Sequence, residues 1–327
     1  MIMDATKTLI NKLGKDRVLL NEPLSSHCTW RVGGLAKLWY EAKTKEELIK
    51  SITLARKYQI PYFVLAGGSN VLFSDRGFDG LVIKNSTSKI SFAGITGRIN
   101  NQIKKEAVFI EAESGVMFNR LVRFTLNQGL TGLEYFLGQP GTVGGAVYMN
   151  AHFMLKNKFV GDYLSSAKIL NNENKVTDVE ASYFRFGYDQ SIIQKTGEIV
   201  LSAVFKLAKS NKTSVWEAAN ETIAYRQKTQ PQGYPTAGCT FRNISTADAI
   251  SLSIPNQIRS AGFLIDQCSL KGFAIGGAEI SHDHANFILN KNKATAKDII
   301  SLINLCKDKV REKFGAVLTE EITYGGF

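Results

Sequence analysis

Cysteine and histidine are scarce in this chain of 327 residues, which has four of each. No two cysteines have the C-x-x-C spacing and histidines are few, so we do not expect a structural zinc site of the usual kind. A chain of this length can fold without disulfides, and we expect reduced thiols and a cytoplasmic location. The cysteines are Cys28, Cys239, Cys268 and Cys306.

Two of the histidines flank an aspartate in His282-Asp283-His284. The triplet favours a polar turn over a metal site, because residues i and i+2 suit few metal geometries without further ligands. We therefore predict that the protein holds no metal.

Long apolar runs and blocks of like charge are also missing. No uncharged apolar run approaches the roughly 20 residues of a membrane span, and the N-terminal segment lacks the apolar block of a secretory signal. The formal net charge is +11, but the lysines are scattered and no RNA-binding aromatic motif is present. We predict a solvated basic surface with a few cations placed for a phosphate-bearing small molecule, and no nucleic acid, membrane or obligate protein partner.

Hydrophobic periodicity predicts a chain that mixes strands and helices. Thr44 and Glu47 have the form of a capping box, as do Thr295 and Asp298 before the C-terminal helix. The first strands and helix form a β-α-β unit with a glycine turn after its second strand, and the polar segment 208–214 is the best candidate linker. Strands are predicted over 36–42, 62–65, 81–83, 108–112, 167–170 and 199–207, and helices over 45–58, 117–128, 215–228 and 296–314.

Two glycine-rich segments lie in the first half of the chain. Residues 138–152 read GQPGTVGGAVYMNAH, and residues 67–70 read GGSN. Neither has the spacing of a Rossmann fingerprint or a P-loop. Glycine turns usually serve only as tight turns, yet bare turn amides also form anion-binding concavities. Two such turns, each beside an apolar strand, favour a dinucleotide that lies between two subdomains.

Five stretches together make a specific resemblance. The chain resembles the bacterial UDP-N-acetylenolpyruvoylglucosamine reductases, flavoenzymes of peptidoglycan precursor synthesis, over about residues 25–325. The stretches are TWRVGG (29–34), LAGGSNVLFSD (65–75), GLEYFLGQPGTVGGAVYMNA (132–151), TAGCTFRN (236–243) and AGFLIDQCSLKGFAIGGAEISHDHANFILN (261–290). The order and spacing continue through the C-terminal helix to LTEEI (318–322).

The resemblance implies an α+β fold and a reaction. Residues 1–210 would form a two-subdomain FAD-binding module of the vanillyl-alcohol-oxidase type, divided near 85–100, and residues 211–327 a C-terminal α+β substrate-binding domain. The reaction implied is reduction of an enolpyruvyl ether on UDP-N-acetylglucosamine, which gives UDP-N-acetylmuramate. NADPH is the implied co-substrate and FAD the bound cofactor.

The resemblance also implies site residues. Those expected to hold FAD are Arg31, Gly67, Gly68, Ser69, Asn70, Gly138, Gly141, Thr142, Gly144, Gly145 and Ala146. Those expected to face the sugar nucleotide are Tyr188, Lys228, Arg242, Asn243 and Lys271. The catalytic residues expected are Cys239, Glu321 and Arg185.

Two catalytic positions depart from the family pattern. Cys239 stands where the family usually has a serine that supplies a proton, and a thiol, with a pKa of roughly 8.5, yields a proton at least as readily as an alcohol. Asp189 stands where the family has an arginine, and a carboxylate there would repel the substrate's carboxylate unless a cation intervenes. Arg185 and Arg242 are the possible substitutes. His152, another departure, is either a cofactor contact or a simple loop histidine.

Three rival functions stay open at this point. The chain could be a different FAD oxidoreductase on the same module, such as an oxidase of small alcohols. It could be a flavin-binding or UDP-sugar-binding protein that has lost catalysis, since Asp189 and Cys239 both depart from the pattern. The net charge alone leaves a nucleic-acid binder, which would show strongly salt-dependent affinity.

Overall fold

The structure is a computed structural model that describes residues 2–96 and 107–327. The chain divides into two compact units, and neither is a single consecutive stretch. Unit 1 contains residues 1–18, 40–67 and 83–226, and unit 2 contains residues 19–39, 68–82 and 227–327. The division falls within β1 (Val18–Pro23), β2 (Leu35–Ala42) and β5 (Phe78–Asn85), so one four-stranded sheet, in the order β1-β2-β5-β3, contributes to both units.

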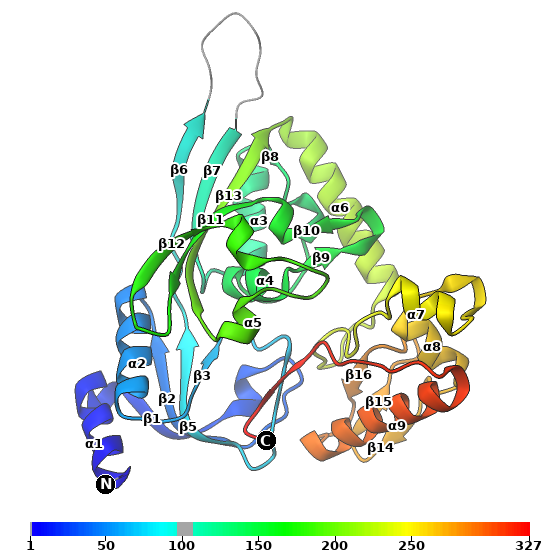
Figure 1. The fold of residues 1–327 in the computed structure, drawn as a ribbon, viewed down its shortest axis with the longest axis horizontal. Coiled ribbons are helices and arrows are strands. Elements are labelled where there is room, and N and C mark those ends of the chain that lie inside the picture. Colours follow the sequence, from blue (N-terminus) through cyan, green and yellow to red (C-terminus); the bar gives the residue numbers. More distant parts are fainter. Residues whose placement is uncertain (1, 97–106) are drawn as a thin grey trace, which may run out of the picture. The chain divides into compact units, whose positions relative to one another are not determined.

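A large antiparallel sheet forms the body of unit 1. Its order is β12-β11-β13-β7-β6, with β8 paired to one end of β13. The helices α3 and α4 pack on each other, and α4 also packs on β7 and β13 (Figure 1). The strands are β6 (Ile90–Thr96), β7 (Ala107–Glu113), β8 (Leu130–Thr131), β11 (Leu164–Leu170), β12 (Val176–Glu180) and β13 (Ile199–Lys209).

Burial in unit 1 follows the sequence periods. Alternate residues of β7 are buried, as expected for a strand with one covered face. In α3 the buried residues Phe118, Leu121, Val122 and Thr125 recur at helical spacing. The remaining elements are α1 (Ile2–Leu13), α2 (Lys45–Lys57), α3 (Phe118–Asn127), α4 (Val143–Met149), α5 (Ile193–Thr196), β3 (Tyr62–Leu65), β9 (His152–Phe153) and β10 (Lys158–Phe159). The helix α6 (Lys212–Thr229) belongs to unit 1 as far as Arg226.

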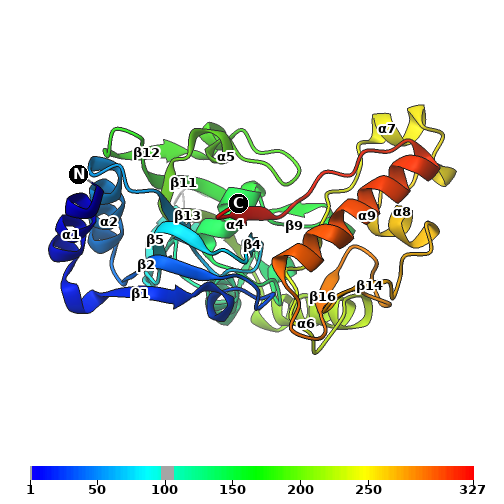
Figure 2. The ribbon, with the colours of Figure 1, turned by 90° about the horizontal axis from the view of Figure 1, so that it is seen from below.

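Unit 2 is built around a small sheet in the order β14-β15-β16, covered by α9. Figure 2 shows α9 alongside α8, and the two helices contact each other. A second pair of strands is parallel, with β17 at the C-terminus pairing with β4 after the GGSN turn. The elements are β4 (Val71–Phe73), α7 (Thr246–Ser251), α8 (Ala261–Gln267), β14 (Ala274–Ile275), β15 (Ala278–Ile280), β16 (Ile288–Asn290), α9 (Ala296–Phe314) and β17 (Thr323–Gly325).

Most predicted elements are confirmed to within a few residues, but one expectation is corrected. The two strands of the predicted β-α-β unit lie in one sheet, in which β5 separates β2 from β3. The segment 208–214 is mostly regular structure, because β13 continues to Lys209 and α6 begins at Lys212. The functional division at residue 210 stays a prediction.

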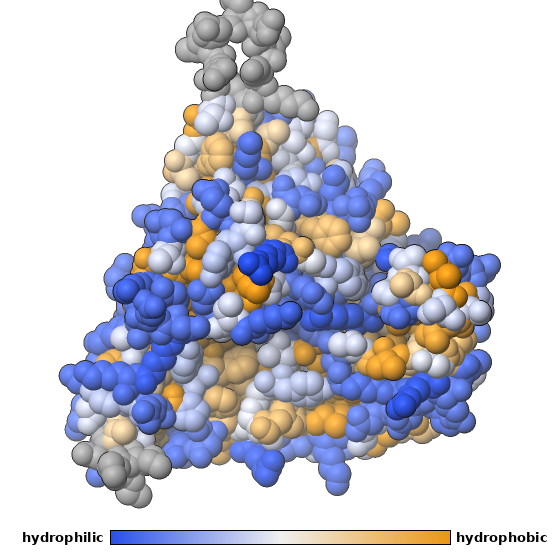
Figure 3. All heavy atoms as spheres, viewed as in Figure 1, coloured by the Kyte–Doolittle hydropathy of each residue, from blue (hydrophilic) through white to orange (hydrophobic). Residues whose placement is uncertain are grey.

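Figure 3 shows polar side chains spread over the face drawn, with apolar ones in small groups between them.

The capping box of α9 offers a test of the local structure. The Thr295 hydroxyl accepts from the Asp298 amide at 3.1 Å, and the Asp298 carboxylate accepts from the Thr295 amide at 2.9 Å. We expect Thr295→Ala to lower the free energy of unfolding by about 1 kcal/mol at pH 7. Urea denaturation measures this, with Ser301→Ala on the same helix as the control, since that exposed hydroxyl donates to the Lys297 carbonyl within the helix and caps neither end.

Acid should reduce the stability that the Asp298 carboxylate gives to the folded state, which an Asp298→Ala variant measures. Backbone hydrogen bonding at Thr295 holds the pKa of Asp298 below its ordinary value of 3.8. The folded state therefore binds this proton less readily than the unfolded state, and the stabilisation is present above that value and is lost as the pH falls through the lowered pKa. An Asp298→Ala variant that loses as much stability relative to the parent at strongly acid pH as at pH 7 would contradict this account.

Candidate active site

The two glycine turns meet backbone to backbone in unit 1. A Cβ built on Gly67 would lie 2.8 Å from the Cα of Gly141, which is closer than real Cβ atoms come. A Cβ on Gly144 would lie 2.9 Å from the side chain of Ser114. Side chains are therefore absent from these positions because the backbone itself packs closely there.

One glycine of the same segment faces open space instead. Thr142 is the N-cap of α4, and its hydroxyl accepts from the Gly145 amide at 3.4 Å. A Cβ on Gly145 would meet only that hydroxyl, at 3.8 Å. A position with room for a side chain but none present leaves the backbone open to close approach by a ligand.

A half-buried lysine, Lys84, supports the GGSN turn at residues 67–70. Lys84 donates from Nζ to the carbonyl of Ala66, directly before Gly67, at 2.5 Å. Burial lowers the pKa of Lys84 below its ordinary value. A partly desolvated ammonium beside bare backbone suits an anionic group, so these residues fit the diphosphate of a dinucleotide. The sequence analysis missed Lys84, because nothing local distinguishes it from the other lysines.

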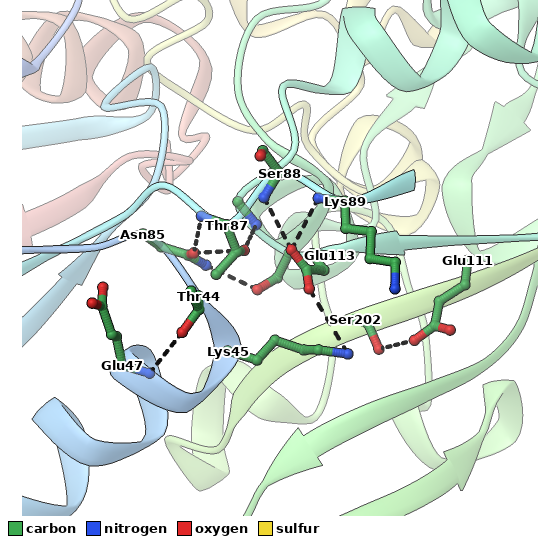
Figure 4. A network of polar contacts seen from close by, with 12 residues as sticks. Thr44, Lys45, Glu47, Asn85, Thr87, Ser88, Lys89, Glu111, Glu113 and Ser202 are labelled. Carbon is green, nitrogen blue, oxygen red and sulfur yellow. Dashed lines mark hydrogen bonds and ion pairs between the residues drawn. The ribbon is translucent and has the colours of Figure 1, made fainter. Parts of the chain in front are cut away.

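A polar network joins residues 85–89 to residues 113–115 (Figure 4). Asn85 donates to Ser114 at 2.8 Å and accepts from the hydroxyl of Thr87 at 2.9 Å, and that hydroxyl accepts from the Gly115 amide at 2.9 Å. Glu113 accepts from the amides of Ser88 and Lys89. The network joins the end of β5 to the end of β7, which fixes the Ser114 surface against which Gly144 packs.

In unit 2 the rest of the GGSN turn is held by neighbouring backbone. A Cβ on Gly68 would lie 2.1 Å from the carbonyl of His27, and the Gly68 carbonyl accepts from the Thr29 amide at 2.9 Å. Arg31 follows with an exposed side chain and a left-handed φ of 56°. These contacts place the start of the TWRVGG stretch against the GGSN turn.

The predicted proton donor and acid lie on neighbouring backbone segments of unit 2. The Glu321 amide donates to the Thr240 carbonyl at 2.9 Å, next to Cys239. The Glu321 carbonyl accepts from Asn70 Nδ2 at 3.1 Å, and the Asn70 carbonyl accepts from the Thr323 amide at 2.9 Å. Three stretches far apart in sequence are thus joined through Glu321. The catalytic roles themselves stay predictions.

Asn286 holds the other side of the thiol segment. Its carbonyl accepts from the Thr240 amide at 2.8 Å, and its side chain exchanges two hydrogen bonds with the backbone of Phe241 at 2.9 and 2.7 Å. The segment that carries Cys239 is therefore fixed on both sides. Asn286 was not among the predicted residues, because its role is visible only once residues 240 and 286 are adjacent.

The predicted substrate residues of unit 2 differ in their surroundings. The Nε of Arg242 is buried, and within the described chain it has no hydrogen-bond partner. Asn243 accepts from the Ala261 amide at the start of α8 at 3.0 Å. Lys271 is paired with Asp266 at 2.9 Å, and Lys228 is exposed near the end of α6. Arg242, beside the thiol, has the environment that best suits an anionic ligand.

In unit 1, Asp189 is buried with 1% of its surface exposed. One of its carboxylate oxygens lies 3.1 Å from Nδ1 of His152. Arg185 is exposed on the same loop, and it has a left-handed φ of 45°. The ring of Tyr188 lies 4.9 Å from that of His152. The structure therefore brings His152 to Asp189, and not Arg185.

The remaining sequence expectations concern cysteines, histidines and membranes. Ser281 accepts from the amides of Asp283 and His284, so the histidine pair lies in a polar turn as predicted. All four cysteines are free thiols. Within residues 2–96 and 107–327, no helix has the length and apolar character needed to cross a membrane.

Comparison with known proteins covers nearly the whole chain. Residues 230–324 match the family model of the UDP-N-acetylenolpyruvoylglucosamine reductase C-terminal domain, and residues 36–180 match an FAD binding domain. A UDP-N-acetylenolpyruvoylglucosamine reductase of Desulforamulus reducens is 34% identical over 98% of both chains. One of Prochlorococcus marinus is 37% identical over 94% of this chain and 97% of its own.

Solved structures agree with these matches. The UDP-N-acetylenolpyruvylglucosamine reductase of Thermus caldophilus superposes with a TM-score of 0.70 at 31% identity, covering 94% of this chain and 98% of its own. A vanillyl-alcohol-oxidase-type flavoprotein of Myceliophthora thermophila has a TM-score of 0.56 at 9% identity, covering 94% of this chain and 85% of its own. The second likeness shows the fold, which is the α+β fold predicted from the sequence.

Proposed function

This chain belongs to the UDP-N-acetylenolpyruvoylglucosamine reductase family, and from that membership we propose that it reduces UDP-N-acetyl-3-O-(1-carboxyvinyl)-glucosamine to UDP-N-acetylmuramate. It is an NADPH-dependent oxidoreductase of peptidoglycan precursor synthesis with FAD as cofactor. The observation that carries the proposal is the joining of the GGSN turn, the Cys239 segment and the Glu321 segment through backbone hydrogen bonds.

The residues have separate tasks in this chemistry. When bound, FAD supplies hydride that originates from NADPH. A vinyl ether conjugated to a carboxylate accepts hydride at its terminal carbon, and negative charge then develops on the adjacent carbon and the carboxylate. We assign to Cys239 the proton that this adjacent carbon takes up, and to Glu321 and Arg242 the orientation and charge balance of the substrate.

Cofactor and substrate contacts complete the proposal. Bare backbone at Gly67, Gly141 and Gly145, with Lys84 behind it, would hold the diphosphate of FAD. The other predicted cofactor residues, Arg31, Gly68, Ser69, Asn70, Gly138, Thr142, Gly144 and Ala146, keep that assignment as proposals. The residues that we propose to contact the substrate also include Tyr188, Lys228, Asn243 and Lys271. Arg185 remains a proposal as a further cation.

The domain assignment and location belong to the same proposal. We assign FAD binding to residues 1–210 and substrate binding to residues 211–327, which the positions of the two family matches support. Four free thiols support a reducing, cytoplasmic location. Apart from FAD and NADPH, we propose the UDP-sugar as the one partner that the reaction needs.

One assay tests the function and separates its rivals. The purified protein should show flavin absorbance and should oxidise NADPH rapidly only when the enolpyruvyl sugar nucleotide is present. Flavin absorbance without substrate-dependent NADPH loss would favour a protein that has lost catalysis. Reduced flavin that reacts faster with oxygen than with the enolpyruvyl substrate would favour an oxidase, and either result would overturn the proposal.

A further inference from the structure

The second half of the GQPGTVGG segment (138–145) is held by backbone hydrogen bonds to the chain that leads into α3. The Gly144 amide donates to the Ser114 carbonyl at 2.8 Å, and the Gly141 carbonyl accepts from the Phe118 amide at 2.9 Å. Pro140, directly before, has no N–H group and cannot extend this pairing as a donor. The first half of the segment therefore depends on a different support.

A side chain supplies that support. Asn119 is the second residue of α3. Its Oδ1 accepts from the Gly138 amide at 2.7 Å, and its Nδ2 donates to the Gln139 carbonyl at 2.9 Å. The carboxamide thus offers one acceptor and one donor to the segment, as a backbone peptide group would. Reversing the amide would set donor against donor and acceptor against acceptor, so the two bonds together define its orientation.

The residues in this clamp follow a backbone path that an unconstrained chain seldom keeps. Gly138 and Gly141 have left-handed φ values of 87° and 108°. Glycine has more backbone freedom than any other residue, so ordering it has the largest entropic cost. Because a glycine lies on each side of Gln139 and Pro140, this stretch would leave its path easily without a support. The clamp from Asn119 fixes the path within the protein itself.

The path leads directly to the open backbone at the start of α4. Thr142 follows Gly141 and caps the helix, and a Cβ on Gly145 would meet only the Thr142 hydroxyl, at 3.8 Å. Residues 36–180, which include Asn119 and the whole segment, match an FAD binding domain. All of these positions of the clamp and the helix belong to unit 1. The clamp therefore acts on the backbone that we assign to the FAD diphosphate.

We propose that Asn119 is a positioning residue for FAD, which holds the backbone of residues 138–141 in the cofactor-binding path before the cofactor arrives. The inference rests on the proposed placement of FAD at the GQPGTVGG segment. A site that is ordered in advance loses less conformational entropy when its ligand binds. Without the clamp only a fraction of the molecules would have the competent path, and the apparent dissociation constant would rise by the inverse of that fraction.

The kinetics of FAD binding to the flavin-free protein test the proposal. We expect Asn119→Leu, which keeps a similar side-chain size without polar atoms, to weaken binding by about tenfold, the size of two neutral hydrogen bonds. The loss should lie in the association rate, because fewer molecules are competent at any time, while the dissociation rate should match that of the parent. Stopped-flow flavin fluorescence measures both rates. Faster dissociation with unchanged association would instead indicate a direct contact with FAD and would overturn the positioning role.

Hydrogen exchange at the Gly138 amide tests the clamp in the parent protein. In the flavin-free parent this amide should exchange at least tenfold more slowly than in an unstructured peptide, because Asn119 accepts its hydrogen. In Asn119→Leu it should exchange at close to the peptide rate. If the variant does not fold, the parent alone decides: slow exchange supports the clamp, and exchange at the peptide rate rules it out.

The matched control is Asn127→Leu. Asn127 is exposed at the other end of α3, so the same substitution alters the same helix away from the segment. This variant should keep the parent's association rate for FAD and its slow exchange at Gly138. Equal slowing of FAD association in Asn127→Leu and Asn119→Leu would assign the effect to the helix as a whole, against the proposal.

Failure of the proposed function has a different signature. If the parent binds no FAD, then the proposed function and the inference that rests on it are both wrong. If the parent binds FAD and Asn119→Leu binds it with the parent's rates, only the role of Asn119 is wrong.

Discussion

Replacing Cys239 by alanine should lower the rate of substrate reduction by about 100-fold or more, whereas replacing it by serine should preserve substantial turnover. A positioned proton donor contributes roughly 100-fold to 10,000-fold to such a step, and alanine leaves no group that can supply the proton. Serine restores a donor of similar reach. The backbone directly after Cys239 is fixed by Asn286 and Glu321, so a side-chain change at Cys239 should not move the segment.

Half-reactions assign the Cys239→Ala defect to one step. Flavin reduction by NADPH should keep the parent rate, because it does not use the proton, and only reoxidation by the enolpyruvyl substrate should slow. Stopped-flow absorbance of the flavin follows each step separately. Cys268→Ala is the matched control, since Cys268 is also a half-buried free thiol of unit 2, and its Sγ donates to the Lys309 carbonyl. A Cys239→Ala protein that turns over at the parent rate would remove the thiol from the mechanism.

Local sequence signals predicted the elements well. The capping residues Thr44 and Thr295 each begin a helix at the expected place, with their hydroxyls accepting from Glu47 and Asp298. These signals depend on neighbours three residues apart, which the sequence displays directly. Strand order was not predictable in the same way, and β5 separates β2 from β3 because pairing depends on the packing of the whole sheet.

The candidate site was predictable only where residue type and motif coincide. Cys239 and Glu321 were predicted because they lie in the TAGCTFRN and LTEEI stretches that resemble the family. The hydrogen bond from Asn70 that joins the GGSN turn to Glu321 spans 251 positions and could not be predicted in this way. Lys84 and Asn286 carry no local signal. His152 and Asp189 were each visible as departures from the family pattern, yet their pairing across 37 positions appears only when the loop folds back on α4. Long-range contacts of this kind are set by the fold and not by spacing.

Gly145→Glu should change folding stability and flavin binding in opposite directions. Gly145 is the third residue of α4 after its N-cap Thr142, the position where a glutamate completes a capping box. A side chain has room there, since a Cβ meets only the Thr142 hydroxyl at 3.8 Å. Replacing glycine within a helix also favours folding by about 1 kcal/mol. The flavin-free variant should therefore unfold at the same denaturant concentration as the parent or at a higher one.

Flavin binding by the same variant should weaken by about 100-fold, because the new carboxylate would occupy the space proposed for the FAD diphosphate and repel it. Titration of flavin-free protein with FAD, followed by flavin fluorescence, measures the affinity. Gly145→Gln is the control, because glutamine fills the same space without charge and should lose only the steric part. A protein that gains stability and keeps the parent affinity for FAD would show that the open side of Gly145 is not where the diphosphate lies. The glycine there would then need an explanation other than the cofactor, since neither the helix nor its surroundings exclude a side chain.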